Sequence, residues 1–116
     1  MYKINDVIYL YIKGLDKKKS FKETGLAYNR FGKIVDIKED KENDAIEYTI
    51  NIINDKNKNN IMINSVTNQF TFCDMNELID IISSLDISSE AKSNYIELID
   101  NIVQNKDIED TYYKFN

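Results

Sequence analysis

The apolar residues of this 116-residue chain follow two different periods, and the change falls at about Cys73. Before Cys73, short runs rich in β-branched and aromatic residues predict five strands. After it, apolar residues recur every three or four positions, which is typical of amphipathic helices. Strands followed by helices predict an α+β fold. The five expected strands are Val7–Ile12, Phe31–Ile37, Ile46–Ile52, Ile61–Ile63 and Phe70–Phe72.

The pattern within each strand indicates which residues are buried. The first strand is continuously apolar, so we expect it to be covered on both faces. In the third strand apolar residues alternate with polar ones, which predicts one inward face and one outward face. The polar segments 39–44 and 55–60 are expected to form the turns on either side of this strand. The residues expected to point inward are Ile46, Tyr48, Ile50 and Ile52.

Two helices are predicted after Cys73. Asp74, with Glu77 three residues later, has the pattern of a capping box. Ser88 is the expected N-cap of the second helix. The joint Asp86-Ile87 is short, so the helices should be antiparallel neighbours. The expected core-facing stripes are Met75, Leu78, Ile79, Ile82 and Leu85 in the first helix, and Ala91, Tyr95, Leu98, Ile99, Ile102 and Val103 in the second.

A chain of this length is expected to fold as a single domain, residues 1–116, around one region of buried apolar residues. Within it, residues 1–73 form the strand part and residues 74–106 form the helical hairpin. Residues 107–116 form an acidic and then aromatic tail.

Strand order and spacing over about residues 1–73 resemble those of SH3-like small β-barrels. The features that match are the segment 5–10, which leads into the first strand, a long excursion over 13–30, the strand segments 32–37 and 46–50, and a short last strand at 70–72. The resemblance implies a five-stranded antiparallel barrel and a module that binds peptides or nucleic acids. The chain has no Trp and no Pro, whereas the peptide-binding members use both to grip proline-rich ligands. That recognition mode is therefore not expected here.

The composition excludes several common kinds of catalytic and metal site. The chain has no histidine, so it has no histidine base and no imidazole metal site. Its single cysteine excludes a disulfide within the chain and a thiolate zinc cluster, and three glycines do not make a phosphate-binding loop. Cys73 has no histidine partner and is followed by Asp74, which opposes a thiolate. We therefore interpret Cys73 as a buried apolar residue.

Two segments carry oxygen ligands of the kind that bind Ca²⁺, the acidic segment 36–44 and the polar segment 55–60. A calcium loop also needs Gly at its sixth position and Glu at its twelfth. Counted from Asp40, these positions hold Ala45 and Asn51, and the count from Asp55 fails as well. Both segments are interpreted as solvated hairpin turns. We expect no enzymatic activity, no metal and no cofactor.

Charge is distributed unevenly along the chain, although the net value is −5. Residues 13–33 carry seven cationic side chains against two acidic ones, whereas residues 74–116 carry ten acidic side chains against three cationic ones. The helical half therefore should repel nucleic acid and attract a positively charged protein surface.

The function predicted first is that of a non-enzymatic inhibitor or adaptor that occupies a basic surface of a host or cognate protein. The chain is rich in Ile and Asn, which have A/T-rich codons, and this indicates a low-G+C bacterium or its phages and mobile elements. Such an origin suits an anti-defence protein of the anti-CRISPR kind, or an immunity protein. The expected partner-binding residues are the helix carboxylates and the aromatic tail: Asp80, Glu90, Glu97, Asp100, Tyr112, Tyr113 and Phe115.

The alternative function is nucleic-acid binding by the basic segment 13–33, whose cations are interleaved with aromatic rings. A homodimer formed through the helical hairpin is a third candidate. No apolar run is long enough for a signal peptide or a membrane span, so a cytoplasmic location without a membrane partner is expected. The residues expected to bind nucleic acid are Lys17, Lys18, Lys19, Lys22, Tyr28 and Arg30.

Overall fold

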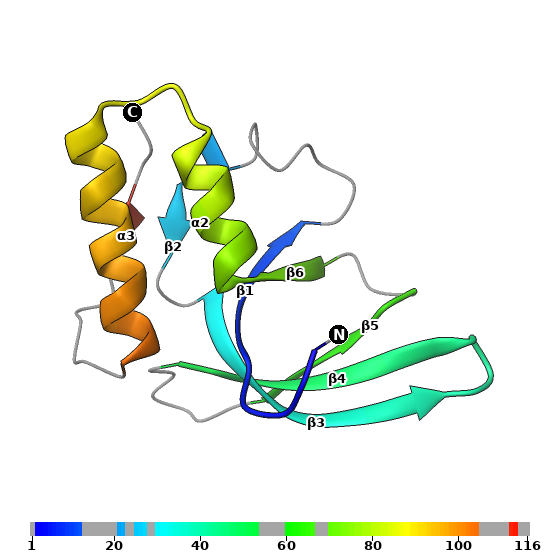
Figure 1. The fold of residues 1–116 in the computed structure, drawn as a ribbon. Coiled ribbons are helices and arrows are strands. Elements are labelled where there is room, and N and C mark those ends of the chain that lie inside the picture. Colours follow the sequence, from blue (N-terminus) through cyan, green and yellow to red (C-terminus); the bar gives the residue numbers. More distant parts are fainter. Residues whose placement is uncertain are drawn as a thin grey trace.

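Among the residues that the structure describes, the fold combines a five-stranded antiparallel sheet, a two-stranded sheet and two helices of 9 and 15 residues, and this is the predicted α+β class (Figure 1). The computed structural model describes residues 2–12, 21–22, 25–27, 30–53, 60–66, 70–104 and 112–113. The large sheet has the order β5-β4-β3-β1-β6. Its strands are β1 (Val7–Ile12), β3 (Phe31–Asp40), β4 (Ala45–Ile52), β5 (Asn60–Asn64) and β6 (Phe70–Asp74).

The smaller elements complete the helix-bearing side of the molecule. The two-stranded sheet pairs β2 (Leu26–Ala27) with β7 (Tyr112–Tyr113). The helices α2 (Met75–Ser83) and α3 (Ser89–Val103) follow β6 directly and run antiparallel side by side, as predicted (Figure 1). In the described part of the chain, no helix is both long and apolar enough to cross a membrane.

Strand β1 lies between two groups of buried side chains, so the prediction that both of its faces are covered is confirmed. Ile8 and Leu10 belong to one group, and Tyr9 and Tyr11 belong to the other. All four side chains are at most 8% exposed. Alternate residues of a strand point to opposite faces, which explains how one strand serves both groups.

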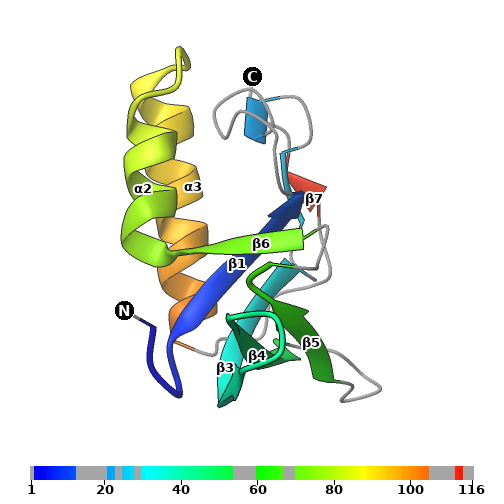
Figure 2. The ribbon, with the colours of Figure 1, turned by 90° about the vertical axis from the view of Figure 1, so that its right-hand side faces the viewer.

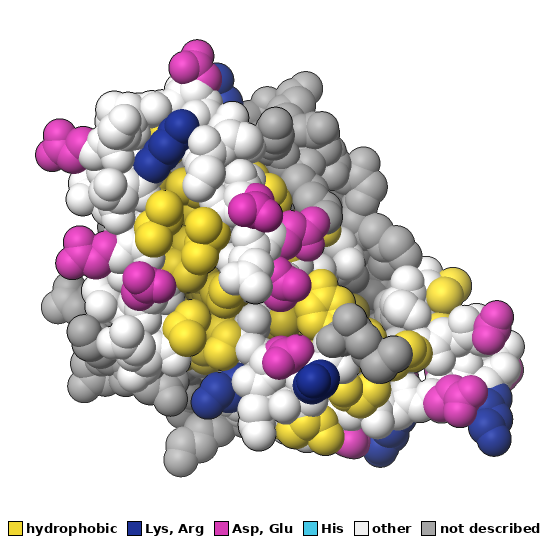
Figure 3. Space-filling view, in the orientation of Figure 1, with side chains coloured by type: hydrophobic (Ala, Val, Ile, Leu, Met, Phe, Trp, Pro, Cys, Tyr) yellow, Lys and Arg dark blue, Asp and Glu magenta, His cyan; other side chains and the backbone are white. Residues whose placement is uncertain are grey.

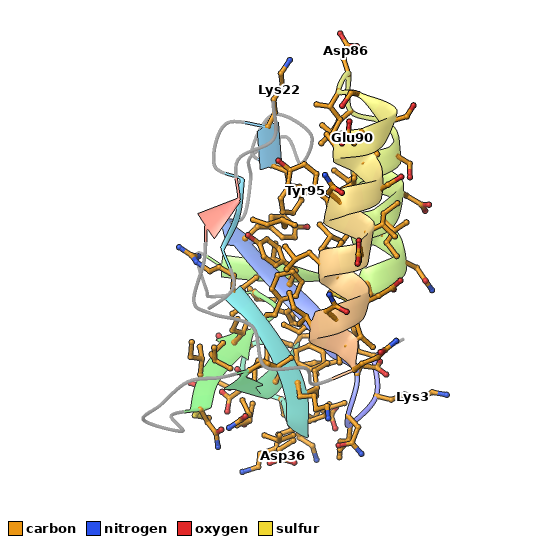
Figure 4. The ribbon with its side chains drawn as sticks, turned by 90° about the vertical axis from the view of Figure 1, so that its left-hand side faces the viewer. Lys3, Lys22, Asp36, Asp86, Glu90 and Tyr95 are labelled. Atoms are coloured by element: carbon orange, nitrogen blue, oxygen red, sulfur yellow. The ribbon has the colours of Figure 1, made fainter. Side chains whose placement is uncertain are left out.

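The first group, the helix-side core, fills the space between the two helices and the strands β1, β2 and β6 (Figures 2 and 4). Tyr95 points from α3 toward the strands in this layer (Figure 4). Each fully buried Ile or Leu here contributes roughly 1.5–3 kcal/mol of apolar burial. Its members include Tyr9, Phe21, Phe31, Leu78, Ile82, Ile99 and Ile102.

The second group, the sheet core, is built from the strands alone. Its buried members come from all five strands of the large sheet, and half-buried Tyr2 packs against them. Tyr2, Tyr48 and Phe72 form edge-to-face ring contacts with one another, with centroids 4.7–6.0 Å apart. The buried members are Ile8, Leu10, Ile34, Tyr48, Ile50, Ile52, Ile63 and Phe72.

Both predicted helix caps are confirmed. The Asp74 carboxylate accepts a hydrogen bond from the Glu77 backbone N–H at 2.7 Å, and the Ser88 hydroxyl accepts one from the Ala91 N–H at 3.1 Å. Each cap satisfies a backbone donor that the first helical turn leaves unpaired. These local signals explain why each helix begins where the sequence predicts.

The predicted closed barrel is not formed by the described strands. They make an open sheet in which β5 and β6 are the two edges and do not pair with each other. Strand β3, which corresponds to the second predicted strand, is also longer than expected, since it runs to Asp40 rather than to Ile37. Asp40 accepts hydrogen bonds from the Asn43 backbone N–H at 3.3 Å and from the Asn64 amide at 2.7 Å, and so anchors the tight turn that follows.

Two residues predicted to be buried are exposed, and one buried residue of α2 was missing from its predicted stripe. Ile46 is 41% exposed because it pairs with Glu39 in the part of the β3–β4 ribbon that extends past the other strands (Figure 1). Val103 is 43% exposed at the end of α3. Ile81, which the α2 stripe omitted, is 7% exposed and belongs to the helix-side core.

Candidate functional site

The four helix carboxylates singled out from the sequence are all exposed: Asp80, Glu90, Glu97 and Asp100. The cause is the helical period. On α2, Asp80 lies about 200° around the axis from both Leu78 and Ile82, which are buried. On α3, Glu90 and Glu97 lie on the side opposite the buried Tyr95 and Ile102. None of the four carboxylates forms an ion pair with a described residue.

The same two helices carry very little positive charge. From Asp74 to Gln104 the chain has seven carboxylates and one lysine, Lys92. The Lys92 amine donates a hydrogen bond to the backbone carbonyl oxygen of Ser83 at 2.9 Å, so its charge is directed toward the end of α2. Figure 3 shows acidic side chains over both helices on this face. The helical surface therefore carries a net negative charge, which favours contact with cationic groups.

An apolar strip runs between the two helices on this face (Figure 3). On α2, Met75, Ile79 and Ser83 are each four residues apart and so lie in one row along the helix. Met75 and Ile79 are half-buried. On α3, half-buried Ile96 and exposed Val103 lie in the row along the helix that begins at Lys92, at positions i+4 and i+11 from it. The Lys92–Ser83 hydrogen bond joins the two rows at one end. We call Met75, Ile79, Ile96 and Val103 the interhelical strip.

The interhelical strip is not visible in the pattern of either helix alone, because it is formed by residues of both. Ile79 and Val103 were assigned to core-facing stripes, yet they lie at the borders of those stripes. Acidic side chains border the strip on both helices (Figure 3). An apolar strip with carboxylates on both sides is a surface that can bury apolar side chains and pair with cations at once.

The predicted aromatic anchors are placed only in part. The backbone of Tyr112 pairs with Ala27 and that of Tyr113 pairs with Leu26, so this short segment is joined to the domain. Figure 2 shows β7 across β1 from the helices. The described tail backbone therefore does not share the acidic face of α2 and α3. Phe115 lies outside the described residues.

The residues of the alternative, nucleic-acid-binding site are described only at its margins. Lys17, Lys18, Lys19 and Tyr28 lie outside the described residues. Lys22 is exposed and points away from the domain (Figure 4). Arg30 is half-buried.

The four described rings that accompany these cations in the sequence belong to the helix-side core. Phe21 is 1% exposed and lies 5.3 Å from the ring of Tyr9 and 5.8 Å from that of Tyr11. Phe31 is fully buried and lies 4.7 Å from Tyr9. Bases stack on exposed rings. These four rings are therefore occupied in packing and form no stacking platform.

Nucleophiles and acids do not converge on a cleft in the described part of the chain. Cys73 is a free cysteine that is fully buried in the helix-side core, as expected for a small apolar residue. Across the described residues, no group of three or more Cys, Asp or Glu side chains could hold a metal ion. Hydrogen bonds from Asn43 and Asn64 lower the pKa of Asp40, whose role is to anchor the hairpin turn.

Two surface recesses are lined by described residues of the strand half. One, of about 150 Å³, is lined by the aromatic side chains Tyr2, Tyr48 and Phe72 together with Asn64. Burial, and then the nearby carboxylates of Asp74 and Glu77, raise the pKa of Tyr2 to about 12. The other, of about 520 Å³, lies along the β3–β4 ribbon between Ile37 and Ile46. Neither brings together the acid, base and nucleophile that a reaction would need.

Among the described residues, the acidic helices with their interhelical strip form a surface on which charge, exposure and apolar area coincide. Comparison with known protein families, with curated proteins and with solved structures found no match to this chain.

Proposed function

We propose that this chain is a non-enzymatic protein-binding module that inhibits or links its partner by covering a positively charged surface. One observation carries the proposal: Asp80, Glu90, Glu97 and Asp100 are all exposed on two helices that hold a single lysine. Such a field speeds encounter with a cationic partner and disfavours contact with nucleic acid. The free energy of binding then depends on how well the apolar residues between the carboxylates are covered.

The arrangement of the strands supports a binding module. The sheet order β5-β4-β3-β1-β6, with a long connection between β1 and β3, is compatible with an SH3-like arrangement. The acidity and the abundance of Ile and Asn suit an inhibitor carried by a phage or mobile element of a low-G+C bacterium. We therefore propose an anti-defence role of the anti-CRISPR kind, or that of an immunity protein, as the setting of this binding.

The proposal is tested with two variants of equal net charge. The first neutralises the helix carboxylates (Asp80→Asn, Glu90→Gln, Glu97→Gln and Asp100→Asn). The second neutralises four carboxylates of the strand half (Glu39→Gln, Glu42→Gln, Asp44→Asn and Glu47→Gln). Each immobilised full chain is exposed to the soluble proteins of a low-G+C host, and retained proteins are identified by mass spectrometry.

We expect the wild type and the strand variant to retain the same dominant partner, and the helix variant to lose it. Retention should also fall as salt rises, because exposed charges are screened beyond about 10 Å at 0.1 M salt. Equal retention by both variants would contradict the proposal, and so would equal loss. The matched charge separates a local surface effect from a general effect of acidity.

Binding to single-stranded DNA and RNA is the competing outcome. A gel shift at low salt that is lost on Lys17→Glu, Lys18→Glu and Lys19→Glu would favour the nucleic-acid function instead. We expect no shift, because the described rings near the basic segment are buried and the helical half is strongly acidic.

A further inference from the structure

We infer that the interhelical strip binds a cationic amphipathic helix of the partner protein. This inference rests on the proposed function and names the element that the acidic surface recognises. The strip is formed by Met75 and Ile79 on α2 and by Ile96 and Val103 on α3, and Figure 3 shows hydrophobic side chains gathered between the two helices. The apolar face of an amphipathic helix is a natural occupant of such a band.

The shape of the strip favours a helix over a loop. The strip follows two antiparallel helices, and its members on α3, Ile96 and Val103, are seven positions apart, which corresponds to about 10 Å along the helix axis. A helix laid along it would present apolar residues at i, i+4, i+7 and i+11, so that several side chains contact the strip together. The partly exposed side chains offer apolar area while the helix-side core beneath them stays covered.

The charge around the strip decides which helix it accepts. Acidic side chains lie on both of its sides (Figure 3), and Asp80 on α2 and Asp100 on α3 are exposed. A helix with Lys or Arg beside its apolar face would pair these carboxylates on both flanks. Lys92 does not offset them along the strip, because its amine is bonded to Ser83 at one end.

A second copy of this chain is a poor occupant for the same reason. Pairing two hairpins through the strip would place seven carboxylates of one copy near seven of the other, with one lysine on each side. Like charges brought together at an interface oppose association. The apolar area could be covered in a homodimer, but the charge would not be balanced. The homodimer therefore serves as an alternative outcome of the test.

The test uses three synthetic peptides of about 18 residues and the full chain. The first peptide is helical, with Leu at i, i+4, i+7 and i+11 and Lys on both flanks. The second has the same composition in an order that destroys the apolar face. The third replaces Lys by Glu. Binding is measured by fluorescence anisotropy, and light scattering reports the oligomeric state of the chain alone.

We expect the first peptide to bind at least about tenfold more tightly than the second, because it adds apolar burial to the charge contacts that both share. The third peptide should show no binding. Equal affinity of the first two peptides would mean attraction by charge alone and would overturn the inference. Absence of binding by the first peptide at low salt, or a stable dimer of the chain that resists the peptide, would overturn it as well.

Two double variants localise the site on the chain. Ile79→Gln with Val103→Gln alters the strip, and Val35→Gln with Met62→Gln alters apolar residues of the sheet that are 40% and 55% exposed. We expect the strip variant to weaken binding of the first peptide by about fivefold or more and the sheet variant to leave it unchanged. Val103→Gln alone, at a residue that is 43% exposed, repeats the test if the double variant does not fold.

The inference and the proposed function fail in different ways. If neutralising the helix carboxylates abolishes retention of the host partner while the strip variant retains it fully, the acidic surface binds the partner without the strip. The proposed function then stands, and the inference that the strip binds a cationic helix is refuted. If neither change affects retention of the partner, the proposed function itself fails.

Discussion

The Lys92 amine donates a hydrogen bond to the backbone carbonyl oxygen of Ser83 at 2.9 Å, and so connects the first turns of α3 to the C-terminal end of α2. No basic residue lies in the last turn of α2 itself. The carbonyl groups at a helix C-terminus are left without helical partners and carry partial negative charge. Lys92 therefore supplies from the neighbouring helix the cation that α2 lacks.

Lys92→Gln should lower the free energy of unfolding by about 0.5–1 kcal/mol, because it removes both the charge and the hydrogen bond. The control is Lys41→Gln, at an exposed turn residue, which changes the net charge equally. Urea denaturation monitored by circular dichroism measures the free energy of unfolding of both variants. Equal effects of the two substitutions would mean that Lys92 acts only through overall charge.

Gly32 lies in β3 at a point where neighbouring strands approach closely on both sides, since it pairs with Ile8 of β1 and Ile52 of β4. A Cβ atom there would come within 2.5 Å of Ile50 Cγ2 and 3.1 Å of the Asn51 carbonyl oxygen. Ile50 is fully buried and β-branched, so it cannot turn aside freely. Gly32→Ala should therefore destabilise the fold by about 1–3 kcal/mol. A denaturation midpoint equal to that of the wild type would contradict this packing.

Ile102 and Val103 are adjacent residues that the helical pattern assigns to the same stripe, but their environments differ. Ile102 is fully buried and Val103 is 43% exposed. Ile102→Ala should cost about 2–5 kcal/mol of unfolding free energy, whereas Val103→Ala should change it by no more than about 0.5 kcal/mol. Thermal and urea denaturation of the two variants test this directly. Similar losses in both would show that Val103 is packed as the sequence pattern predicts.

This pair illustrates the limit of helical periodicity. Residues 102 and 103 are about 100° apart around the axis, and a broad apolar stripe does not reveal which of its borders faces the core. The exposure of Glu90, Glu97 and Asp100 could be predicted, because charged residues on the side opposite the apolar stripe face solvent. The interhelical strip could not, because it depends on how two helices lie against each other.

The strands show the same division between local and long-range information. The caps at Asp74 and Ser88 and the burial of β1 follow from neighbouring residues, and they are confirmed. The open sheet and the exposure of Ile46 depend on which distant strands pair and where the sheet ends. The alternation of apolar and polar residues within one strand does not reveal which strands pair with it or where the sheet ends. The backbone pairing of Tyr112 and Tyr113 with β2 likewise joins segments far apart in the chain.

Tyr2 provides a pH-dependent test of the packing around the aromatic recess. Its ring lies 4.7 Å from that of Phe72 and 6.0 Å from that of Tyr48. Burial raises the pKa of Tyr2 to about 12, and the charges of Asp74 and Glu77 act in the same direction. The folded protein therefore holds the phenol proton more tightly than the unfolded chain does.

The sign of the linkage follows from this difference. The stabilisation due to neutral Tyr2 is complete below the unfolded pKa of about 10 and is lost as pH rises through about 12. Tyr2→Phe cannot ionise, so its denaturation midpoint should fall less than that of the wild type between about pH 10 and pH 12. The difference in ultraviolet absorbance between the two proteins during alkaline titration isolates the phenolate of Tyr2. A midpoint near pH 10 in that difference, as for an exposed tyrosine, would show that Tyr2 does not pack against Phe72 and Tyr48.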